Sequence, residues 1–198
     1  MKKNNELNLN NLGIFISKIP QKLLNKIKTE CLNLSKKEKM ISSLTSKKVA
    51  DHYHLEDNNK ELFSFLSISI KKYLKKYNYL KYYKVLNNDA KIIFKKPWFN
   101  IQKKGEFIPN HTHDGLLSYS IWIQLPFLKN DKKRKFESCF EFQYQNILGA
   151  TTNHLIKLDK SYEGKFVLFP SMLQHCVYPF FDNDEMRVSV SGNICFDN

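Results

Sequence analysis

The stretch "RVSVSGNICF", residues 187–196, alternates between polar and apolar side chains over most of its length. In an extended strand, successive side chains point to opposite faces of the sheet, so a period of two separates one face from the other. One face then carries the polar side chains Arg187, Ser189, Ser191 and Asn193. The other face carries Val188, Val190 and Ile194. We therefore expect a strand that turns one face to a core and presents polar groups on the other.

The same strand pattern runs through the second half of the chain. From Lys91 onward the apolar runs are short, rich in β-branched and aromatic residues, and separated by turn residues. The expected strands are 91–94, 98–102, 116–125, 138–144, 154–158, 165–170, 174–180 and 187–196. In the second of these, Trp98, Asn100 and Gln102 point opposite to Phe99 and Ile101. About eight short strands are typical of a jelly roll or small sandwich.

The first half of the chain has helical spacing instead. After Pro20, which suits a first helical turn, apolar residues recur with the period of a helix up to Leu34. A second helix is expected over 59–77, and the polar segment 47–60 before it is expected to be a loop or short turn. We therefore predict an all-β core with N-terminal helices (α+β), as one domain over 1–198. Its helical part, about 1–90, would pack on a jelly-roll core, about 91–198.

The charge of the chain favours few partners. A net charge of +13 and a pI of about 9.5 would ordinarily suggest nucleic acid or an anionic membrane. Nearly all of this charge is lysine scattered along the chain, which is typical of solvated surfaces, and Arg134 and Arg187 are the only arginines. No stretch has the length and apolarity of a membrane span or a leader. The four cysteines lack metal-site spacing, so we expect reduced thiols and a cytoplasmic location, that of the host cell if the chain is viral.

Three histidines in the strand-rich half form a candidate metal site. His111 and His113 are two residues apart, and in an extended segment both side chains project to the same side. A third imidazole is available from His175, and Gly115 permits a turn after the pair. Imidazole suits iron, zinc, copper or nickel, and three protein ligands with open positions indicate a catalytic site. A polar surface loop and a packed histidine are the alternative interpretations.

Arg187 is the second candidate feature. It shares a strand face with Ser189, and a guanidinium with a hydroxyl two residues away is suited to binding a carboxylate. The alternative is an ordinary ion pair with Asp184 or Glu185.

Two segments carry a resemblance to a known family: "WFNIQKKGEFIPNHTHDGLLSYSIWIQLPF" and "EGKFVLFPSMLQHCVYPFFDNDEMRVSVSGNICF". Together they resemble the 2-oxoglutarate/Fe(II)-dependent oxygenases, and in particular a small group found in marine phages and bacteria. The resemblance implies a double-stranded β-helix, the jelly-roll fold of that superfamily, with His111 and His175 as iron ligands. It implies that Arg187 and Ser189 bind the distal carboxylate of 2-oxoglutarate. The cosubstrate pocket would be lined by residues among Asn100, Ser118, Ser120, Trp122 and Asn193.

The remaining ligand position departs from the superfamily pattern. The superfamily uses H-x-D or H-x-E, whereas this chain places His113 there and Asp114 one residue later. We favour His113, because spacing decides which side chain turns inward. Asp114 remains an alternative if the Gly115 turn bends the backbone, and so does ligation by two histidines alone.

The resemblance implies an enzyme that uses Fe(II), 2-oxoglutarate and dioxygen to hydroxylate an unreactive C–H bond. By family analogy, a prolyl or other protein side chain is the leading candidate substrate, and a small molecule is also possible. Two alternatives are a cupin-like zinc enzyme with three histidine ligands and a non-catalytic basic binding module. The sequence leaves the oligomeric state open.

Overall fold

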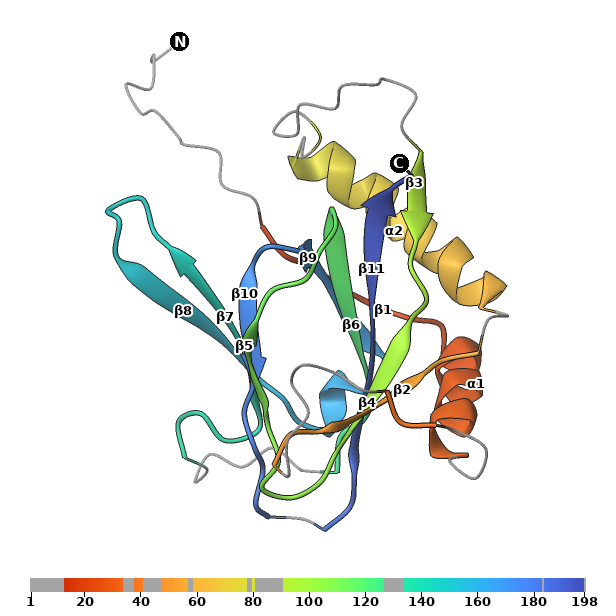
Figure 1. Cartoon of the computed structure of the whole chain (residues 1–198), viewed down its shortest axis with the longest axis vertical. Coiled ribbons are helices and arrows are strands. Elements are labelled where there is room, and N and C mark those ends of the chain that lie inside the picture. Colours follow the sequence, from red (N-terminus) through yellow and green to blue (C-terminus); the bar gives the residue numbers. More distant parts are fainter. Residues whose placement is uncertain are drawn as a thin grey trace.

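The computed structural model describes residues 13–33, 38–40, 48–56, 59–77, 80, 91–126, 134–182 and 184–197. Two helices and eleven strands follow one another in these ranges (Figure 1). In chain order they are β1 (Phe15–Lys18), α1 (Gln21–Leu32), β2 (Asp51–His54), α2 (Lys60–Tyr77), β3 (Ile92–Phe94), β4 (Trp98–Gln102), β5 (Ile108–His111), β6 (Leu117–Gln124), β7 (Cys139–Gln145), β8 (Thr151–Lys157), β9 (Lys165–Pro170), β10 (Gln174–Val177) and β11 (Arg187–Phe196). A short 3₁₀ turn, η3 (Lys160–Tyr162), precedes β9.

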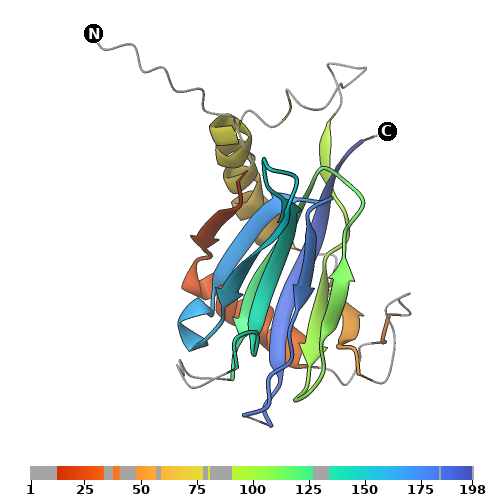
Figure 2. The ribbon, with the colours of Figure 1, turned by 90° about the vertical axis from the view of Figure 1, so that its left-hand side faces the viewer.

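The described strands form two antiparallel sheets. The larger has seven strands, with the order β1-β9-β6-β11-β4-β2 and with β3 paired to β11. The smaller has four, in the order β5-β10-β7-β8. The sheets lie face to face in Figure 1, and Figure 2 looks onto the smaller one with the larger behind it. This is the jelly-roll architecture that the strand spacing predicted, so the predicted fold class is confirmed.

Both helices pack on the outer face of the larger sheet (Figure 1). Their buried side chains, which include Leu23, Ile27, Leu66 and Ile70, form one apolar cluster with outward-facing sheet residues such as Phe99. A second apolar cluster fills part of the space between the sheets. Each strand of the larger sheet therefore has one face toward the helices and one toward the interior, as the alternation predicted.

Strand β6 shows this division clearly. Leu117, Tyr119, Ile121 and Ile123 belong to the cluster beneath the helices, whereas Trp122 belongs to the cluster between the sheets. In β11, Val188, Val190 and Ile194 likewise pack beneath the helices. The polar residues of these strands are left to face the interior, where the candidate site lies.

The expected loop or short turn at 47–60 is wrong, because part of it is strand β2. Asp51–His54 pairs along β4, and the buried ring of Tyr53 stacks on Phe99 with centroids 5.2 Å apart. Four residues among polar neighbours give little sequence signal, and the strand exists because β4 offers it a hydrogen-bonding edge. Strand β1 was not predicted either. The single-domain prediction for the whole chain extends beyond the described residues and stays a prediction.

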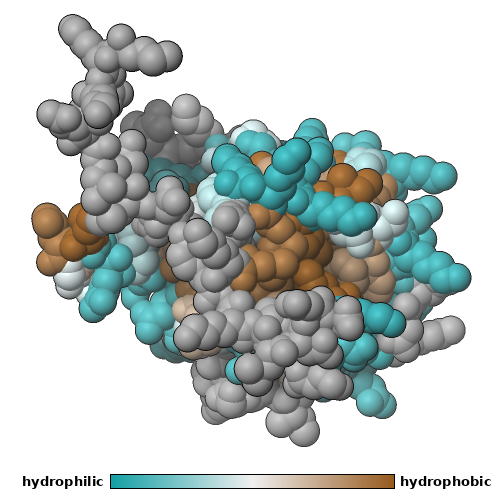
Figure 3. All heavy atoms as spheres, turned by 90° about the horizontal axis from the view of Figure 1, so that it is seen from above, coloured by the Kyte–Doolittle hydropathy of each residue, from teal (hydrophilic) through white to brown (hydrophobic). Residues whose placement is uncertain are grey.

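Seen from above, hydrophilic side chains surround an apolar area near the middle of the described surface, and another apolar area projects at the left (Figure 3). The turn between β7 and β8 exposes Ile147 and Leu148 at 73% and 86%. Within the described residues, no helix combines the length and apolarity that crossing a membrane requires.

Candidate active site

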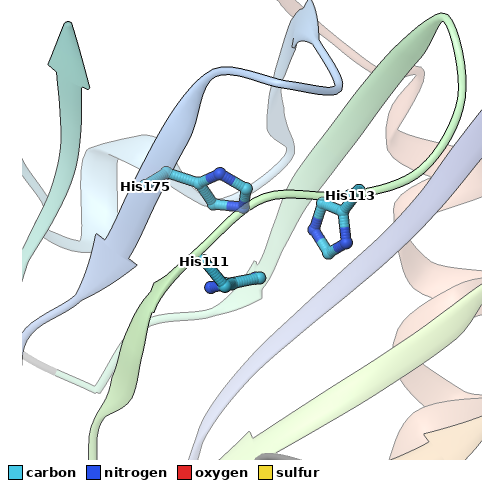
Figure 4. Close-up of side chains that lie close together, drawn as sticks. All are labelled: His111, His113 and His175. Atoms are coloured by element: carbon cyan, nitrogen blue, oxygen red, sulfur yellow. The ribbon is translucent and has the colours of Figure 1, made fainter.

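His111, His113 and His175 meet between the two sheets (Figure 4). His111 ends β5 and pairs in register with His175 on the neighbouring strand β10. His113 follows β5 by two residues, and its backbone N–H donates to the carbonyl of Ser171 over 2.9 Å. The candidate ligand atoms of the three side chains lie within 4.8 Å of one another. In the described part of the chain, no other group of three possible metal-binding side chains is this close together.

Backbone carbonyls orient two of the three rings. Nδ1 of His111 lies 2.8 Å from the carbonyl oxygen of Pro109, and Nδ1 of His175 lies 2.9 Å from that of Leu173. Because a carbonyl oxygen only accepts hydrogen bonds, each Nδ1 carries the proton. Each Nε2 therefore keeps its lone pair, which is the arrangement found in metal-binding histidines.

The environment keeps the three imidazoles neutral. Burial, with repulsion from His111, lowers the pKa of His175 to about 3 and that of His113 to about 4. Burial also lowers the pKa of His111. Since only the neutral ring can bind a metal, the cluster is ready to do so at neutral pH. Three imidazole nitrogens match the chemistry of Fe(II) and leave coordination positions for other ligands.

Asp114 is not part of this cluster. Its side chain is exposed to solvent, and the cluster is formed with His113 instead. The turn that follows depends on Gly115, which has φ +119°. A Cβ at Gly115 would lie 2.9 Å from Cys195 Sγ and from the carbonyl oxygen of Ile194. The loop thus runs tightly over the end of β11, with His113 turned inward and Asp114 outward.

The histidines line a cavity of about 310 Å³ that is formed by both sheets. From the larger sheet it is lined by Asn100, Ser120, Trp122, Arg187, Ser189 and Ser191, among others. The described lining contains no aspartate or glutamate. With Arg187 in the wall and no acid in the described lining, the cavity has a positive charge, which suits an anionic ligand.

Arg187 lies at the start of β11, opposite Gln102 on β4, and is 2% exposed. Burial lowers its pKa to about 9, because the charged form loses its hydration. A carboxylate bound beside it would favour the charged form again. Asp184 was one of the two acids named as a possible ion-pair partner of Arg187. Its Oδ1 lies 3.1 Å from Lys104 Nζ.

The other predicted site residues fall into two groups. Asn100 Nδ2 donates to Ser189 Oγ over 3.3 Å, and Ser191 Oγ donates to Ser120 Oγ over 3.5 Å, all along the cavity wall. Ser118, by contrast, donates to Asn193 Oδ1 over 2.8 Å and lies 2.9 Å from Ser171 Oγ. The described cavity lining includes neither Ser118 nor Asn193.

Asn100 Oδ1 and Trp122 Nε1 are among the atoms of the cavity wall that are buried without a hydrogen-bond partner in the described residues. An unpaired buried polar atom costs about 1–3 kcal/mol, so such atoms mark places where a bound molecule or water completes the hydrogen bonds.

His52, which was not among the predicted site residues, lies on β2 and lines the same cavity. Its Nε2 is buried without a hydrogen-bond partner in the described part of the chain. Burial, and then a positive charge on His111, lower its pKa. The signal was present in "DHYH", where His52 and His54 alternate with Asp51 and Tyr53. A segment of four residues among polar neighbours predicts a loop, and only its pairing with β4 turns His52 toward the cavity.

A second cavity, of about 450 Å³, lies elsewhere and is mainly apolar. It is lined by residues that include Ile14, Phe142, Tyr144 and Leu173. Although it is larger, its described lining has no cluster of metal ligands, so the histidine cavity is the better candidate for chemistry.

Comparisons with known proteins agree with this geometry. Residues 96–193, which contain all three histidines and Arg187, match the family model described as "Putative 2OG-Fe(II) oxygenase". No curated protein sequence matches the chain. The match carries no indication of a phage or marine source, and it does not favour the zinc enzyme or the non-catalytic module.

Solved structures share the fold at low sequence identity. A Pseudomonas putida prolyl-4-hydroxylase has 13% identity and a TM-score of 0.58, with 94% of each chain covered. A viral collagen prolyl hydroxylase from Paramecium bursaria Chlorella virus-1 has 11% identity and a TM-score of 0.53, covering 91% of this chain and 94% of that one. The carbocyclase SnoK of nogalamycin biosynthesis has 10% identity and a TM-score of 0.61, covering 94% and 80%. With the family match, the chain belongs to the 2OG-Fe(II) oxygenases, which use Fe(II), 2-oxoglutarate and dioxygen.

Proposed function

We propose that this oxygenase is a hydroxylase in which His111, His113 and His175 hold Fe(II). The observation that carries the proposal is the convergence of three imidazoles within 4.8 Å, in a cavity that also contains the buried Arg187. Neutral rings with fixed tautomers at His111 and His175 support this assignment. Asp114 is exposed, which favours His113 as the third ligand.

We assign the distal carboxylate of 2-oxoglutarate to Arg187 and Ser189. A guanidinium binds a carboxylate through two parallel hydrogen bonds, and the described lining of this cavity contains no aspartate or glutamate. Trp122 Nε1, which lacks a hydrogen-bond partner among the described residues, donates a further hydrogen bond along the wall. Asn100 shapes the wall through the hydrogen bond that its Nδ2 donates to Ser189. Ser120 contributes through its contact with Ser191. Ser118 and Asn193 have a supporting role, because they bond to each other beyond the lining.

The protein contributes geometry and exclusion of water. When bound, the iron and its cosubstrate supply the oxidising power, which releases succinate and carbon dioxide and hydroxylates a C–H bond. The histidines fix the metal on the smaller sheet, and Arg187 orients the cosubstrate from the larger sheet. Phe140 and Phe169 pack beside His175, with ring centroids 5.6 and 4.8 Å away, and keep that side dry.

We propose a prolyl or other protein side chain as the substrate, with a small molecule as the alternative. The family resemblance supports this class, as do the structural neighbours whose names are prolyl hydroxylases. Nucleic acid is a poor candidate, because Arg187 is the only arginine or lysine in the described lining. Mass spectrometry of proline-containing peptides after aerobic turnover would show a gain of one oxygen atom.

We also propose a cytoplasmic location. All four cysteines carry thiols in this structure, as expected in a reducing compartment.

The decisive experiment is an anaerobic titration of the metal-free protein with Fe(II) and then 2-oxoglutarate. Chelation of the keto acid to iron gives a visible charge-transfer band. We expect the band in the parent protein and in Asp114→Ala, the matched control, and its loss in His111→Ala and His113→Ala. An iron-loaded parent without the band would contradict the proposed function. A lost band in Asp114→Ala, with His113→Ala unaffected, would transfer the ligand role to Asp114.

A further inference from the structure

A row of polar side chains crosses the larger sheet at one level of the cavity. The strand register pairs His52 on β2 with Asn100 on β4, and Asn100 with Ser189 on β11. Ser189 pairs in turn with Trp122 on β6. Paired residues on neighbouring strands point to the same face, and all four line the cavity. His52 therefore stands at the β2 end of a row whose other members were predicted to contact the cosubstrate.

The atoms of this row lack hydrogen bonds at three points. His52 Nε2, Asn100 Oδ1 and Trp122 Nε1 are each buried without a partner among the described residues. Burying a polar atom unpaired is costly, so we expect a bound molecule or water to complete these hydrogen bonds, with an acceptor at Trp122 Nε1 and a donor at Asn100 Oδ1. For His52 no acid in the described lining can fill this role.

The row lies between the two ends of the proposed cosubstrate site. Two residues before Ser189 on β11, Arg187 lies opposite Gln102 on β4. Two residues after Ser189, Ser191 lies opposite Trp98. The ring of Trp98 contacts that of His113, with centroids 5.4 Å apart. Each step of two residues is about 6.6 Å. An extended five-carbon chain has four C–C bonds of about 1.5 Å, so its end carbons lie about 5 Å apart and its carboxylate oxygens reach about 1 Å further. A diacid held at Arg187 therefore brings its other end to the row on the histidine side.

His52 is also close to the metal cluster. His52 lines the same cavity as the three candidate ligands, and repulsion between these rings when charged contributes to the lowered pKa values of His52 and His113. The backbone carbonyl of His52 accepts a hydrogen bond from Met40 N over 2.8 Å, which fixes this part of β2 at the cavity. His52 is not within the group of candidate ligands, so its ring remains available to a molecule bound beside the metal.

We propose that His52 is a positioning residue whose Nε2–H donates a hydrogen bond to the keto acid end of 2-oxoglutarate, while Arg187 holds the far carboxylate. This inference rests on the proposed function, because it requires iron and cosubstrate in the cavity. It gives the fourth histidine a role different from that of the three candidate ligands.

The test compares two keto acids. Pyruvate has the same chelating end as 2-oxoglutarate and lacks the second carboxylate, so Arg187 cannot assist its binding. The parent, His52→Phe, His52→Gln and Arg187→Met would each be loaded anaerobically with Fe(II) and titrated with both acids. The readouts are the affinity and wavelength of the charge-transfer band, with Fe(II) affinity measured separately. His54→Phe is the matched control, since His54 lies on the same strand and is exposed.

We expect His52→Phe to weaken both acids by the same factor, roughly tenfold or more, as for a hydrogen bond to a charged group. The band should move to shorter wavelength, because a lost donor raises the energy of the keto acid's acceptor orbital. His52→Gln should restore most of the affinity, and Arg187→Met should weaken 2-oxoglutarate alone.

Unchanged pyruvate affinity and band wavelength in His52→Phe would overturn the inference, as would an equal loss in His54→Phe. A parent protein that gives no band with 2-oxoglutarate would instead refute the proposed function, and this inference with it. The two failures are therefore distinct.

Discussion

His113 determines the charge of the candidate metal site. A histidine at this position leaves the full double positive charge of Fe(II) uncompensated by its protein ligands, whereas a carboxylate would neutralise part of it. The described cavity lining provides no other carboxylate, and Arg187 adds a further positive charge. The cavity should therefore bind a dianionic keto acid strongly, because the ligand supplies the negative charge that the protein omits.

The variant His113→Asp tests this position directly. We expect it to retain Fe(II), because the family pattern places a carboxylate there, and to shift the charge-transfer band to longer wavelength as the anionic ligand makes the iron easier to oxidise. His113→Ala should lose at least about tenfold in Fe(II) affinity, since losing even an outer partner of a metal ligand costs 10–100-fold. Both are measured by anaerobic titration. Equal iron affinity in the parent and His113→Ala would remove His113 from the ligand set.

Arg187 offers a similarly clean comparison, because the chain has one other arginine. Arg187→Met should weaken 2-oxoglutarate binding by roughly 10–100-fold, the value of a hydrogen-bonded charge pair, with Fe(II) affinity retained. Arg134→Met is the control, since Arg134 is exposed. Calorimetric titration of the iron-loaded proteins measures both. If the two variants bound 2-oxoglutarate equally well, the carboxylate would have to be held elsewhere.

At the scale of elements, the length and regularity of a strand decided whether the sequence could predict it. Strand β11 runs for ten residues with clear alternation, and its inward face was predicted residue by residue. Strand β2 has four residues, and its pairing with β4 is a tertiary contact that local sequence does not encode. His52 was missed with it. The three clustered histidines were predicted because two of them follow a local spacing and the third lies in a recognisable strand.

The turn after His113 can be tested through its glycine. A side chain at Gly115 would meet Cys195 Sγ and the backbone at Ile194, so Gly115→Ala should displace the loop and weaken Fe(II) binding. Gly149→Ala is the control, because Gly149 also has positive φ, +76°, and nothing lies within 4 Å of its added Cβ. That control should cost only about 1–2 kcal/mol of stability from backbone strain. Chemical denaturation and iron titration separate the two effects. Equal iron affinities in the two variants would show that the loop does not position His113.

At the scale of the whole molecule, the helices, the core and the site occupy separate places. The helices cover the outer face of the larger sheet, and their apolar cluster contains none of the candidate site residues. The opposite, inward face carries Arg187 and the polar row, whereas His111 and His175 lie on the smaller sheet and His113 follows its strand β5. This division explains why the alternation in β11 revealed both the fold and part of the site: the period of two separates the residues that stabilise the molecule from those that bind its ligands.

The placement of the candidate ligands on one sheet and Arg187 on the other has a mechanical consequence. A cosubstrate that contacts both the metal ligands and Arg187 links the two sheets while it is bound. The sheets should therefore separate less often in the complex. With Fe(II) present, 2-oxoglutarate should slow amide hydrogen exchange at the start of β11 as well as in β2, β5 and β10, whereas pyruvate, which does not reach Arg187, should slow it only in β2, β5 and β10. Identical protection by both acids would mean that the contact with Arg187 does not hold the start of β11 in place. If the patterns differ, the two sheets separate more often each time succinate leaves, so their opening is coupled to turnover.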